Sequence, residues 1–242
     1  MDIKQIEDIS AEMLPNGTTV YVSKNHRFGT DAMLLAHFAN LHREETACDL
    51  GTGCGIIPLK WYDAGHRAAV IGVEIEEEAT SLFARSLQKN NITNIQVENI
   101  DMRQLPPGKH VHVVTCNPPY FTGGFISENN AKATARHELS CTMQEVAKTA
   151  ASLLKDGGRL CVCQRPERLT DVLYAMREHK IEPKHIRFVR QRKNSEVPWL
   201  VLVDGRKGGK PGLHFQADLI MEQEDGTFTK EVLTIYGKEQ AT

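Results

Sequence analysis

The sequence predicts an α/β fold built around an open sheet, and three observations predict it. The apolar run 112–116 has the length and composition of a buried strand. The short strand 47–50 leads into the glycine-rich loop 51–55 and then a helix, which is the nucleotide-binding arrangement. Strand and helix patterns alternate along most of the remaining chain. In folds of this class, ligands bind at the carboxyl edge of the sheet.

Composition and charge limit the possible functions. The chain has 242 residues and a formal net charge of -2, so any nucleic-acid surface must be a local patch. Its apolar runs are too short to span a bilayer, and residues 1–5 lack the form of a signal peptide. We therefore expect a cytoplasmic protein without membrane contact. The six cysteines form no Cys-x-x-Cys pair, so we expect buried, reduced thiols and no metal site.

The residues before the first core strand are expected to form a hairpin and a helix. Residues 18–22 are rich in β-formers and follow a Pro-Asn-Gly turn, which predicts the hairpin. The run 32–39 has helical propensity, with Thr30 or Asp31 as its N-cap. Asp31 suits a cap alone or a cap that also contacts a cofactor, and the sequence does not separate these roles.

The glycine-rich loop, Gly51-Thr52-Gly53-Cys54-Gly55, follows the strand that contains Asp49. Glycines let a backbone approach a ligand closely. The spacing is Gly-x-Gly-x-Gly, which differs from the dinucleotide fingerprint, and no P-loop lysine follows. The loop therefore predicts a cofactor site, followed by a helix from residue 56 to about residue 64.

Glu74 is the last residue of the second expected strand, 68–74. A carboxylate at this position can accept hydrogen bonds from both hydroxyls of a ribose. The alternative is a helix-start acid, the role that we assign to residues 76–78 in a helix that runs to about residue 90. The glycine-rich loop before Glu74 favours ribose binding.

Asp101 and Met102 follow the third strand, 95–97. The Asp101 carboxylate could accept a hydrogen bond from an adenine amino group, and Met102 could pack on the ring. The alternative is that Asp101 only caps a turn. The sequence favours the adenine contact more weakly than it favours the ribose contact of Glu74.

The turn Asn117-Pro118-Pro119-Tyr120 follows the buried strand 112–116 directly, because two prolines cannot extend it. An exocyclic amine on a nucleobase is a poor nucleophile, since its lone pair is delocalised, and it needs acceptors for its two hydrogens. The Asn117 oxygen and the Pro118 carbonyl can accept them, and Tyr120 can stack on the base. The alternative is an ordinary Asn-Pro turn. The position of the Asn-Pro-Pro-Tyr sequence directly after a buried strand favours a catalytic role.

The chain beyond this turn is expected to complete the sheet. The segment 121–140 predicts a functional loop, in which Arg136 is positioned for a phosphate or is simple surface charge, and His137 is not expected to act as a general base. The expected elements are a helix at 142–154 ended by Asp156-Gly157-Gly158, a strand at 159–163, a helix at 165–179, and strands at 186–190 and 200–203.

Basic residues exceed acidic ones between residues 184 and 210. They cluster in two loops, which include Arg192, Lys193 and Lys207. Such an excess could follow the phosphate backbone of an RNA. The alternative is a solvated sheet edge that its charge protects from aggregation. The clustering in loops modestly favours RNA contact.

Taken together, these motifs resemble the S-adenosylmethionine-dependent class I methyltransferases, and the Asn-Pro-Pro-Tyr turn narrows the resemblance to those that methylate amino groups. The runs 28–36 and 135–139 are similar to the bacterial tRNA1(Val) adenine-37 N6-methyltransferase family. The resemblance implies a Rossmann-like, seven-stranded, mostly parallel sheet with helices on both faces. It also implies S-adenosyl-L-methionine as the cofactor and tRNA as the substrate.

The resemblance assigns roles to the predicted site residues. Asp49 and the glycine-rich loop would pass the methionine part of the cofactor, Glu74 would hold its ribose, and Asp101 and Met102 would flank its adenine. Thr30 and Asp31 would help to close the site, and Asn117 would face both cofactor and base. We expect one domain, with an extension at 1–46, a core at 47–204 and a C-terminal tail at 205–242.

Two alternatives stay open. A protein glutamine N5-methyltransferase would share the Asn-Pro-Pro-Tyr turn, although such enzymes usually carry a longer helical N-terminal domain. A non-catalytic RNA-binding module on the same scaffold is the second, although the intact turn argues against it.

Overall fold

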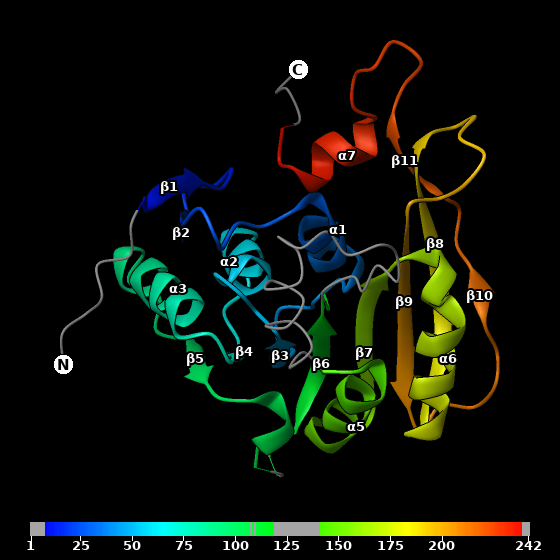
Figure 1. The fold of residues 1–242 in the computed structure, drawn as a ribbon, viewed down its shortest axis with the longest axis horizontal. Coiled ribbons are helices and arrows are strands. Elements are labelled where there is room, and N and C mark those ends of the chain that lie inside the picture. Colours follow the sequence, from blue (N-terminus) through cyan, green and yellow to red (C-terminus); the bar gives the residue numbers. More distant parts are fainter. Residues whose placement is uncertain (1–7, 107, 109, 119–140, 239–242) are drawn as a thin grey trace, which may run out of the picture.

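The computed structural model describes residues 8–106, 108, 110–118 and 141–238. A central sheet of nine strands runs through it (Figure 1). Seven of the strands lie in the order β5 (Ile95–Asn99), β4 (Val70–Glu74), β3 (Ala47–Leu50), β6 (Val111–Cys116), β7 (Leu154–Gln164), β9 (Leu200–Lys207) and β8 (Ile181–Arg192). The pairs from β5 to β7 are parallel, and β9 is antiparallel to both of its neighbours. The expected seven-stranded, mostly parallel arrangement is therefore confirmed within this sheet.

Helices cover both faces of the sheet, as expected. One core contains residues of α1 (Thr30–Phe38), α2 (Ile56–Asp63) and α3 (Glu77–Lys89). The other contains residues of α5 (Met143–Leu153) and α6 (Leu169–Glu178). Strand β7 serves both cores because its side chains alternate between the two faces of the sheet: Cys161 and Cys163 pack into the first, Leu160 and Val162 into the second. Burial of these apolar faces is the main force that stabilises the layers.

Strand order creates a crevice at the carboxyl edge of the sheet. From β3 the chain moves outward through β4 and β5, and then returns to pair β6 with the opposite side of β3. The connections above β3 and β6 therefore leave in opposite directions. In doubly wound sheets such a switch point is where ligands bind.

The expected hairpin is present and is attached to α3. Strands β1 (Ser10–Met13) and β2 (Thr19–Val22) are antiparallel. The Thr19 backbone N–H donates to Asn90 Oδ1 at 2.8 Å, and the Tyr21 N–H donates to Ser86 Oγ at 2.9 Å. Side chains of α3 thus satisfy backbone groups of β2, which fixes the start of the segment that leads to α1.

Two expected element boundaries were wrong. Gly29, with φ −102° and ψ 174°, is the N-cap of α1, so the helix begins at Thr30, and neither Thr30 nor Asp31 is the cap. Helix α5 ends at Leu153, and Leu154 enters β7 at once. The residues at 156–158, expected to end the helix, instead lie in β7, where the pairing with β6 shifts register between Val111 and Val113.

The segment 205–242, expected as a C-terminal tail, contains strands and a helix in the part that the structure describes. Strand β9 extends to Lys207, while β10 (His214–Phe215) and β11 (Leu219–Glu222) pair in parallel with β8. Helix α7 (Lys230–Ile235) then packs near α1, with Val232 and Ile235 buried (Figure 1). The C-terminal segment is therefore part of the folded sheet and its cover.

Ion pairs hold this C-terminal segment in place. Three arginines of β8 each face an acid of the segment: Arg187 with Glu231, Arg190 with Asp218, and Arg192 with Glu222. Exposed pairs of this kind contribute about 0–1 kcal/mol each, so their main effect is on register and charge. Their acids lie outside the interval 184–210, which is why that interval looked basic.

Candidate active site

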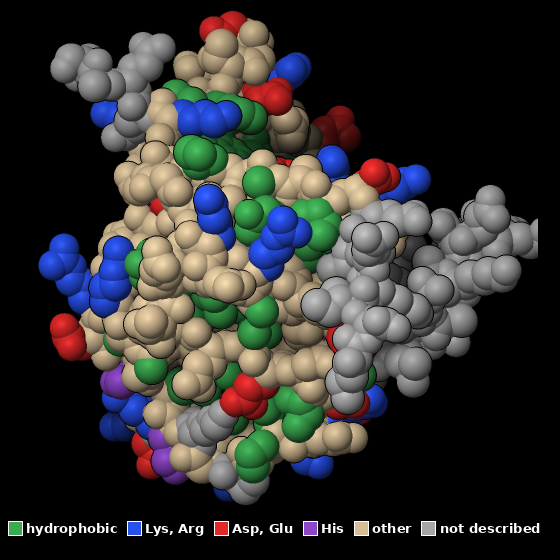
Figure 2. All heavy atoms as spheres, turned by 90° about the vertical axis from the view of Figure 1, so that its left-hand side faces the viewer, with side chains coloured by type: hydrophobic (Ala, Val, Ile, Leu, Met, Phe, Trp, Pro, Cys, Tyr) green, Lys and Arg blue, Asp and Glu red, His purple; other side chains and the backbone are tan. Residues whose placement is uncertain are grey.

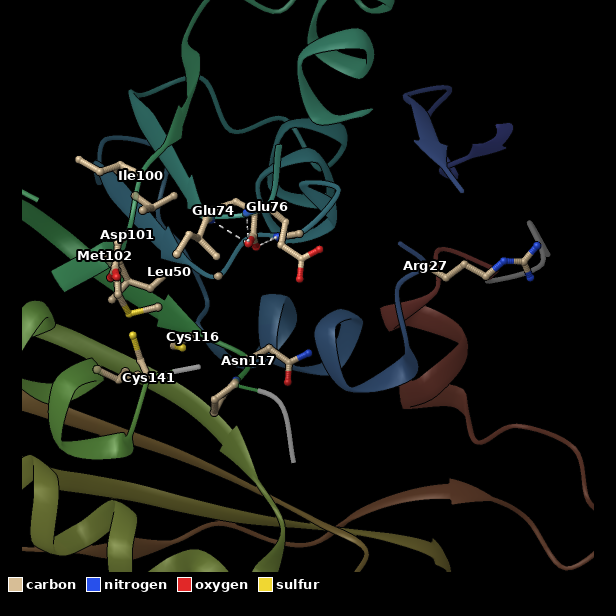
Figure 3. Close-up of a pocket in the computed structure, with 16 residues that line it drawn as sticks. Arg27, Leu50, Glu74, Glu76, Ile100, Asp101, Met102, Cys116, Asn117 and Cys141 are labelled. Carbon is tan, nitrogen blue, oxygen red and sulfur yellow. Dashed lines mark hydrogen bonds between the residues drawn. The ribbon is translucent and has the colours of Figure 1, made fainter. Parts of the chain in front are cut away.

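Two adjoining cavities occupy the crevice at the carboxyl edge of the sheet, and Figure 3 shows the residues that line the larger one. The larger, of about 370 Å³, extends from Glu74 to Asp101 and Met102. The smaller, of about 340 Å³, extends toward Asp49 and the start of α1. Both are lined by Gly51, Gly53, Asn117, Pro118 and Arg27. The structure thus brings most of the predicted cofactor residues to one place.

The glycine-rich loop follows the strand β3 as a tight turn. Gly51 and Gly55 have φ values of +69° and +82°, in the left-handed region that favours glycine. The N–H groups of Gly51 and Thr52 both donate to the Val73 carbonyl, at 2.9 and 3.0 Å. The loop is therefore tied to β4 and exposes its own backbone to both cavities.

Glu74 ends β4 and faces the glycine-rich loop. Its Oε2 accepts from the Gly53 N–H at 2.9 Å, and its Oε1 accepts from the N–H groups of Ile75 and Glu76 at 2.8 and 3.0 Å (Figure 3). A carboxylate has about four acceptor sites, so one is left for a ligand hydroxyl. Helix α3 begins only at Glu77, so Glu74 is not a helix-start acid. Its position fits a ribose contact, which stays a prediction.

Asp49 and Thr52 hold buried oxygens at the smaller cavity. Thr115 Oγ1 donates to Asp49 Oδ1 at 2.6 Å, whereas among the described residues Asp49 Oδ2 and Thr52 Oγ1 form no hydrogen bond of normal geometry. Burial raises the pKa of Asp49 to about 7, although the Thr115 hydrogen bond acts in the opposite direction. Buried polar atoms are normally satisfied, so these two oxygens indicate a place for a ligand donor.

Asp49 is expected to make stability fall as pH rises through the acid-to-neutral range. Its carboxyl titrates near pH 3.8 when exposed but near pH 7 in the folded state, so the folded protein binds a proton that the unfolded chain has lost. The free energy of unfolding should therefore decrease from about pH 4 to pH 7, by up to roughly 4 kcal/mol relative to an Asp49→Asn variant. Urea denaturation of both proteins at several pH values checks this. Parallel pH curves for the two proteins would contradict the raised pKa.

Asp101 both lines the larger cavity and caps the short helix η1 (Met102–Gln104). Its Oδ1 accepts from the Arg103 N–H at 2.9 Å, and its carboxylate pairs with the Arg103 guanidinium. The hydrogen bond from Arg103 lowers the pKa of Asp101. Met102 is partly buried on the same wall. The capping role is therefore present, and the adenine contact stays a prediction.

The residues at the start of α1 divide between the cavity and its surroundings. Asp31 lines the smaller cavity, and its Oδ1 accepts from the Ala32 N–H at 3.0 Å. Thr30 is on the wall of neither cavity, and its Oγ1 accepts from the Tyr236 hydroxyl at 3.0 Å. Cys54 lines the smaller cavity, whereas Gly55 lies outside both, against Phe83. Thr30 and Gly55 are thus structural neighbours of the site.

Asn117 lies where the two cavities meet, at the end of β6. Its Oδ1 accepts from the Cys163 thiol at 3.0 Å, and Pro118 after it is buried. The thiol belongs to β7, so the adjoining strand orients the Asn117 side chain from behind. Pro119, Tyr120, Arg136 and His137 lie outside the described residues.

Arg27 is a site residue that sequence reasoning missed. Among the described residues it is the only cationic side chain that lines either cavity. Its position directly before Phe28 and Gly29, in the run that resembles the family, was the available signal. Figure 3 shows it across the site from Asp101, with its guanidinium pointing away from Asn117.

Two of the three predicted RNA-binding residues of the C-terminal half make contacts within the fold. Arg192 pairs with Glu222 at 3.2 Å. Lys207 Nζ donates to the carbonyls of Ala151 and Leu154, both at 2.7 Å, at the end of α5. Lys193 is exposed. Ion pairs with acids thus offset part of the local basic excess, at Arg187, Arg190 and Arg192, and the RNA contact stays a prediction.

The described residues form a further cavity, of about 510 Å³, which is lined by histidines, basic residues, Glu45 and Asp204 and shares no residue with the two cavities at the glycine-rich loop. In residues 8–106, 108, 110–118 and 141–238, no three His, Cys, Asp or Glu side chains are grouped so as to hold a metal ion. No helix in those ranges has the length and hydropathy to cross a membrane. All six cysteines are free thiols, and Cys141 alone among them is only partly buried.

The fold and the glycine-rich loop at its switch point define a class I methyltransferase fold. Residues 13–180 match the methyltransferase small domain family, and the chain belongs to that family.

Curated relatives carry one shared name, tRNA1(Val) (adenine(37)-N6)-methyltransferase. The protein of Vibrio cholerae is 28% identical over 130 residues, which are 53% of this chain and 54% of that protein. The protein of Shewanella amazonensis is 33% identical over 135 residues, which are 53% of this chain and 56% of that protein. The chain thus spans about half the length of these relatives. The protein of Photorhabdus laumondii is 27% identical over 214 residues, 85% of this chain and 84% of that protein.

Solved structures share the fold. A predicted O-methyltransferase from Agrobacterium tumefaciens is similar with a TM-score of 0.71 and 25% identity, over 88% of this chain and 98% of that chain. A 16S rRNA N2 methyltransferase from T. thermophilus, in complex with AdoMet and guanosine, has a TM-score of 0.59 and 18% identity. The match covers 86% of this chain and 52% of that chain. At the lower identity the likeness concerns the fold alone.

Proposed function

We propose that this protein is an S-adenosyl-L-methionine-dependent methyltransferase that methylates the N6 amino group of an adenine in tRNA. The observation that carries the proposal is the position of Asn117 and Pro118 where the two cavities meet. The names of the relatives support adenine 37 of tRNA1(Val) as the substrate position. We infer a cytoplasmic location from that substrate.

The residues of both cavities fit this cofactor. An ammonium group in the smaller cavity would give Asp49 Oδ2 and Thr52 Oγ1 the donor that they lack. Glu74 would accept a hydrogen bond from a ribose hydroxyl, and Met102 with Ile100 gives the larger cavity an apolar wall for an adenine ring. When bound, the cofactor supplies an electrophilic methyl group.

The protein's part in the reaction is to orient the amine. Asn117 Oδ1 and the Pro118 carbonyl would accept the two N6 hydrogens, which directs the nitrogen lone pair out of conjugation with the ring. The thiol of Cys163 keeps the Asn117 amide in position. After the methyl group is transferred to N6, one amine proton leaves to water, so no tuned general base is required. Tyr120 would stack on the base, as predicted from the sequence.

A methyl-transfer assay on fractionated acceptors tests this function. Bulk tRNA from cells that lack this gene should accept label from S-adenosyl-L-methionine, and tRNA from cells that carry it should accept little, because its site is already methylated. Label in a protein fraction instead would indicate a glutamine methyltransferase. Cofactor binding without transfer to any acceptor would indicate a non-catalytic RNA-binding module.

A further inference from the structure

We propose that Arg27 binds a backbone phosphate of the RNA beside the target adenosine. The site would then take a nucleotide within a strand in preference to a free nucleoside. This inference rests on the proposed function, because it assigns the substrate's anion to that same site.

The backbone at Arg27 is held at both ends. On the β2 side, Ser23 Oγ donates to Glu78 Oε1 at 2.7 Å, and His26 Nε2 lies 3.5 Å from Glu76 Oε2. On the other side, α1 begins at Thr30, whose Oγ1 accepts from Tyr236. The segment 23–29, which we call the strap, is therefore anchored at both ends, and Arg27 within it lines both cavities.

Charge at the cavities singles out Arg27. The larger cavity is lined by Glu74, Glu76 and Asp101, and the smaller by Asp31 and Asp49. An anion that enters would be repelled by these acids except at Arg27, the sole described cation on either wall. Arginine is also the side chain best suited to phosphate, because its planar fork can donate two parallel hydrogen bonds.

The side chain is exposed and free to take a ligand. Among the described residues, Arg27 has no hydrogen bond or ion pair, whereas Arg159, Arg187 and Arg190 are each paired with an acid. Its guanidinium points away from Asn117 (Figure 3). This direction fits a phosphate of an RNA strand better than a carboxylate inside the smaller cavity.

No competing cationic surface is evident on the face of the hairpin and α3. Figure 2 shows the Lys and Arg side chains of the described residues on that face in ones and twos, separated by other side chains and backbone. This face therefore offers no cluster of cations that could replace Arg27 as the phosphate contact.

The test compares Arg27→Ala, Arg27→Lys and the control Arg43→Ala. Arg43 is equally exposed but lines neither cavity. The dissociation constant for tRNA is measured at several salt concentrations with S-adenosylhomocysteine present, and the constant for S-adenosylhomocysteine alone is measured by calorimetry. Arg27→Ala should weaken tRNA binding roughly tenfold and lower the salt slope by about 1. Arg27→Lys should keep the wild-type salt slope but recover only part of the affinity, because it keeps the charge and loses the two parallel hydrogen bonds. Arg43→Ala should match the wild type.

Unchanged binding of S-adenosylhomocysteine by Arg27→Ala shows that the variant is folded. With weaker tRNA binding, it shows that the anion bound by Arg27 belongs to the RNA. Weaker S-adenosylhomocysteine binding with an unchanged salt slope would overturn the inference and assign Arg27 to the cofactor carboxylate. Unchanged values for both ligands would also overturn it. A wild-type protein that binds no tRNA would instead overturn the proposed function, so the two failures are distinguishable.

Discussion

Replacing Asn117 with alanine is expected to lower kcat for methyl transfer by about two to three orders of magnitude, the usual effect of removing one preorganised polar contact to the reacting group. The dissociation constant for S-adenosyl-L-methionine should change little, because Asn117 is one of many residues on the cavity walls. Single-turnover kinetics and calorimetry on the same preparation measure both quantities.

A matched control separates this effect from lost stability. Asn94 is also a half-buried asparagine, but its Nδ2 donates to the Ala68 carbonyl at 2.9 Å, away from the cavities. Asn94→Ala should keep wild-type kcat even if it unfolds at a lower urea concentration. Wild-type turnover in Asn117→Ala would remove the role assigned to Asn117, and an equal loss of cofactor affinity would move that role to cofactor binding.

Replacing Gly55 with alanine is expected to destabilise the protein by about 3 kcal/mol or more, because backbone strain at positive φ adds to the steric overlap of the new Cβ with Phe83. Gly55 has a φ of +82°, and an added Cβ would lie 2.1 Å from Phe83 Cδ2. Phe83 is fully buried beneath the glycine-rich loop, so it has no free space into which to move. The displaced loop should also bind the cofactor less tightly. Urea denaturation and calorimetry measure the two effects.

Gly65 provides the control for backbone strain. Its φ is +94°, yet an added Cβ would meet no atom within 4 Å. Gly65→Ala should therefore lower the free energy of unfolding by only roughly 1 kcal/mol, which is the strain of holding alanine in the left-handed conformation. Equal losses of stability in the two variants would show that Phe83 yields and that the overlap contributes nothing.

Local patterns were enough to predict the elements that form the cofactor side of the site. Strand β3, the glycine-rich loop and Glu74 are each encoded by a short run of residues, and the parallel order of β3, β4 and β6 brings them to one edge. Burial of both faces leaves such strands a strong apolar signal. The sequence-based positions of these strands therefore agree with the structure to within a few residues.

The C-terminal half was harder to predict because its partners are far apart in sequence. The Arg187–Glu231 and Arg190–Asp218 pairs join residues 44 and 28 positions apart. No local pattern specifies that β11 will pair in parallel with β8, so the arginines looked like an RNA surface. The contacts of Lys207 were hidden for the same reason, since its carbonyl partners lie 53 and 56 residues away.

Arg27 escaped prediction because its role depends on how the strap is anchored. The contacts of Ser23 and His26 with Glu78 and Glu76 anchor the strap, and they join residues about fifty positions apart. Without them Arg27 reads as ordinary surface charge. Its place on both cavity walls is a property of the folded chain.

The most direct test of the account is the identity of the methylated nucleoside. tRNA from cells that lack this gene is incubated with the protein and S-adenosyl-L-methionine that carries a deuterated methyl group, then digested and separated by chromatography with mass detection. The account predicts the label in N6-methyladenosine, because Asn117 and Pro118 present acceptors to an exocyclic amine. Label in a ring-nitrogen methyladenosine, a 2′-O-methyl nucleoside or a methylated guanosine would contradict it.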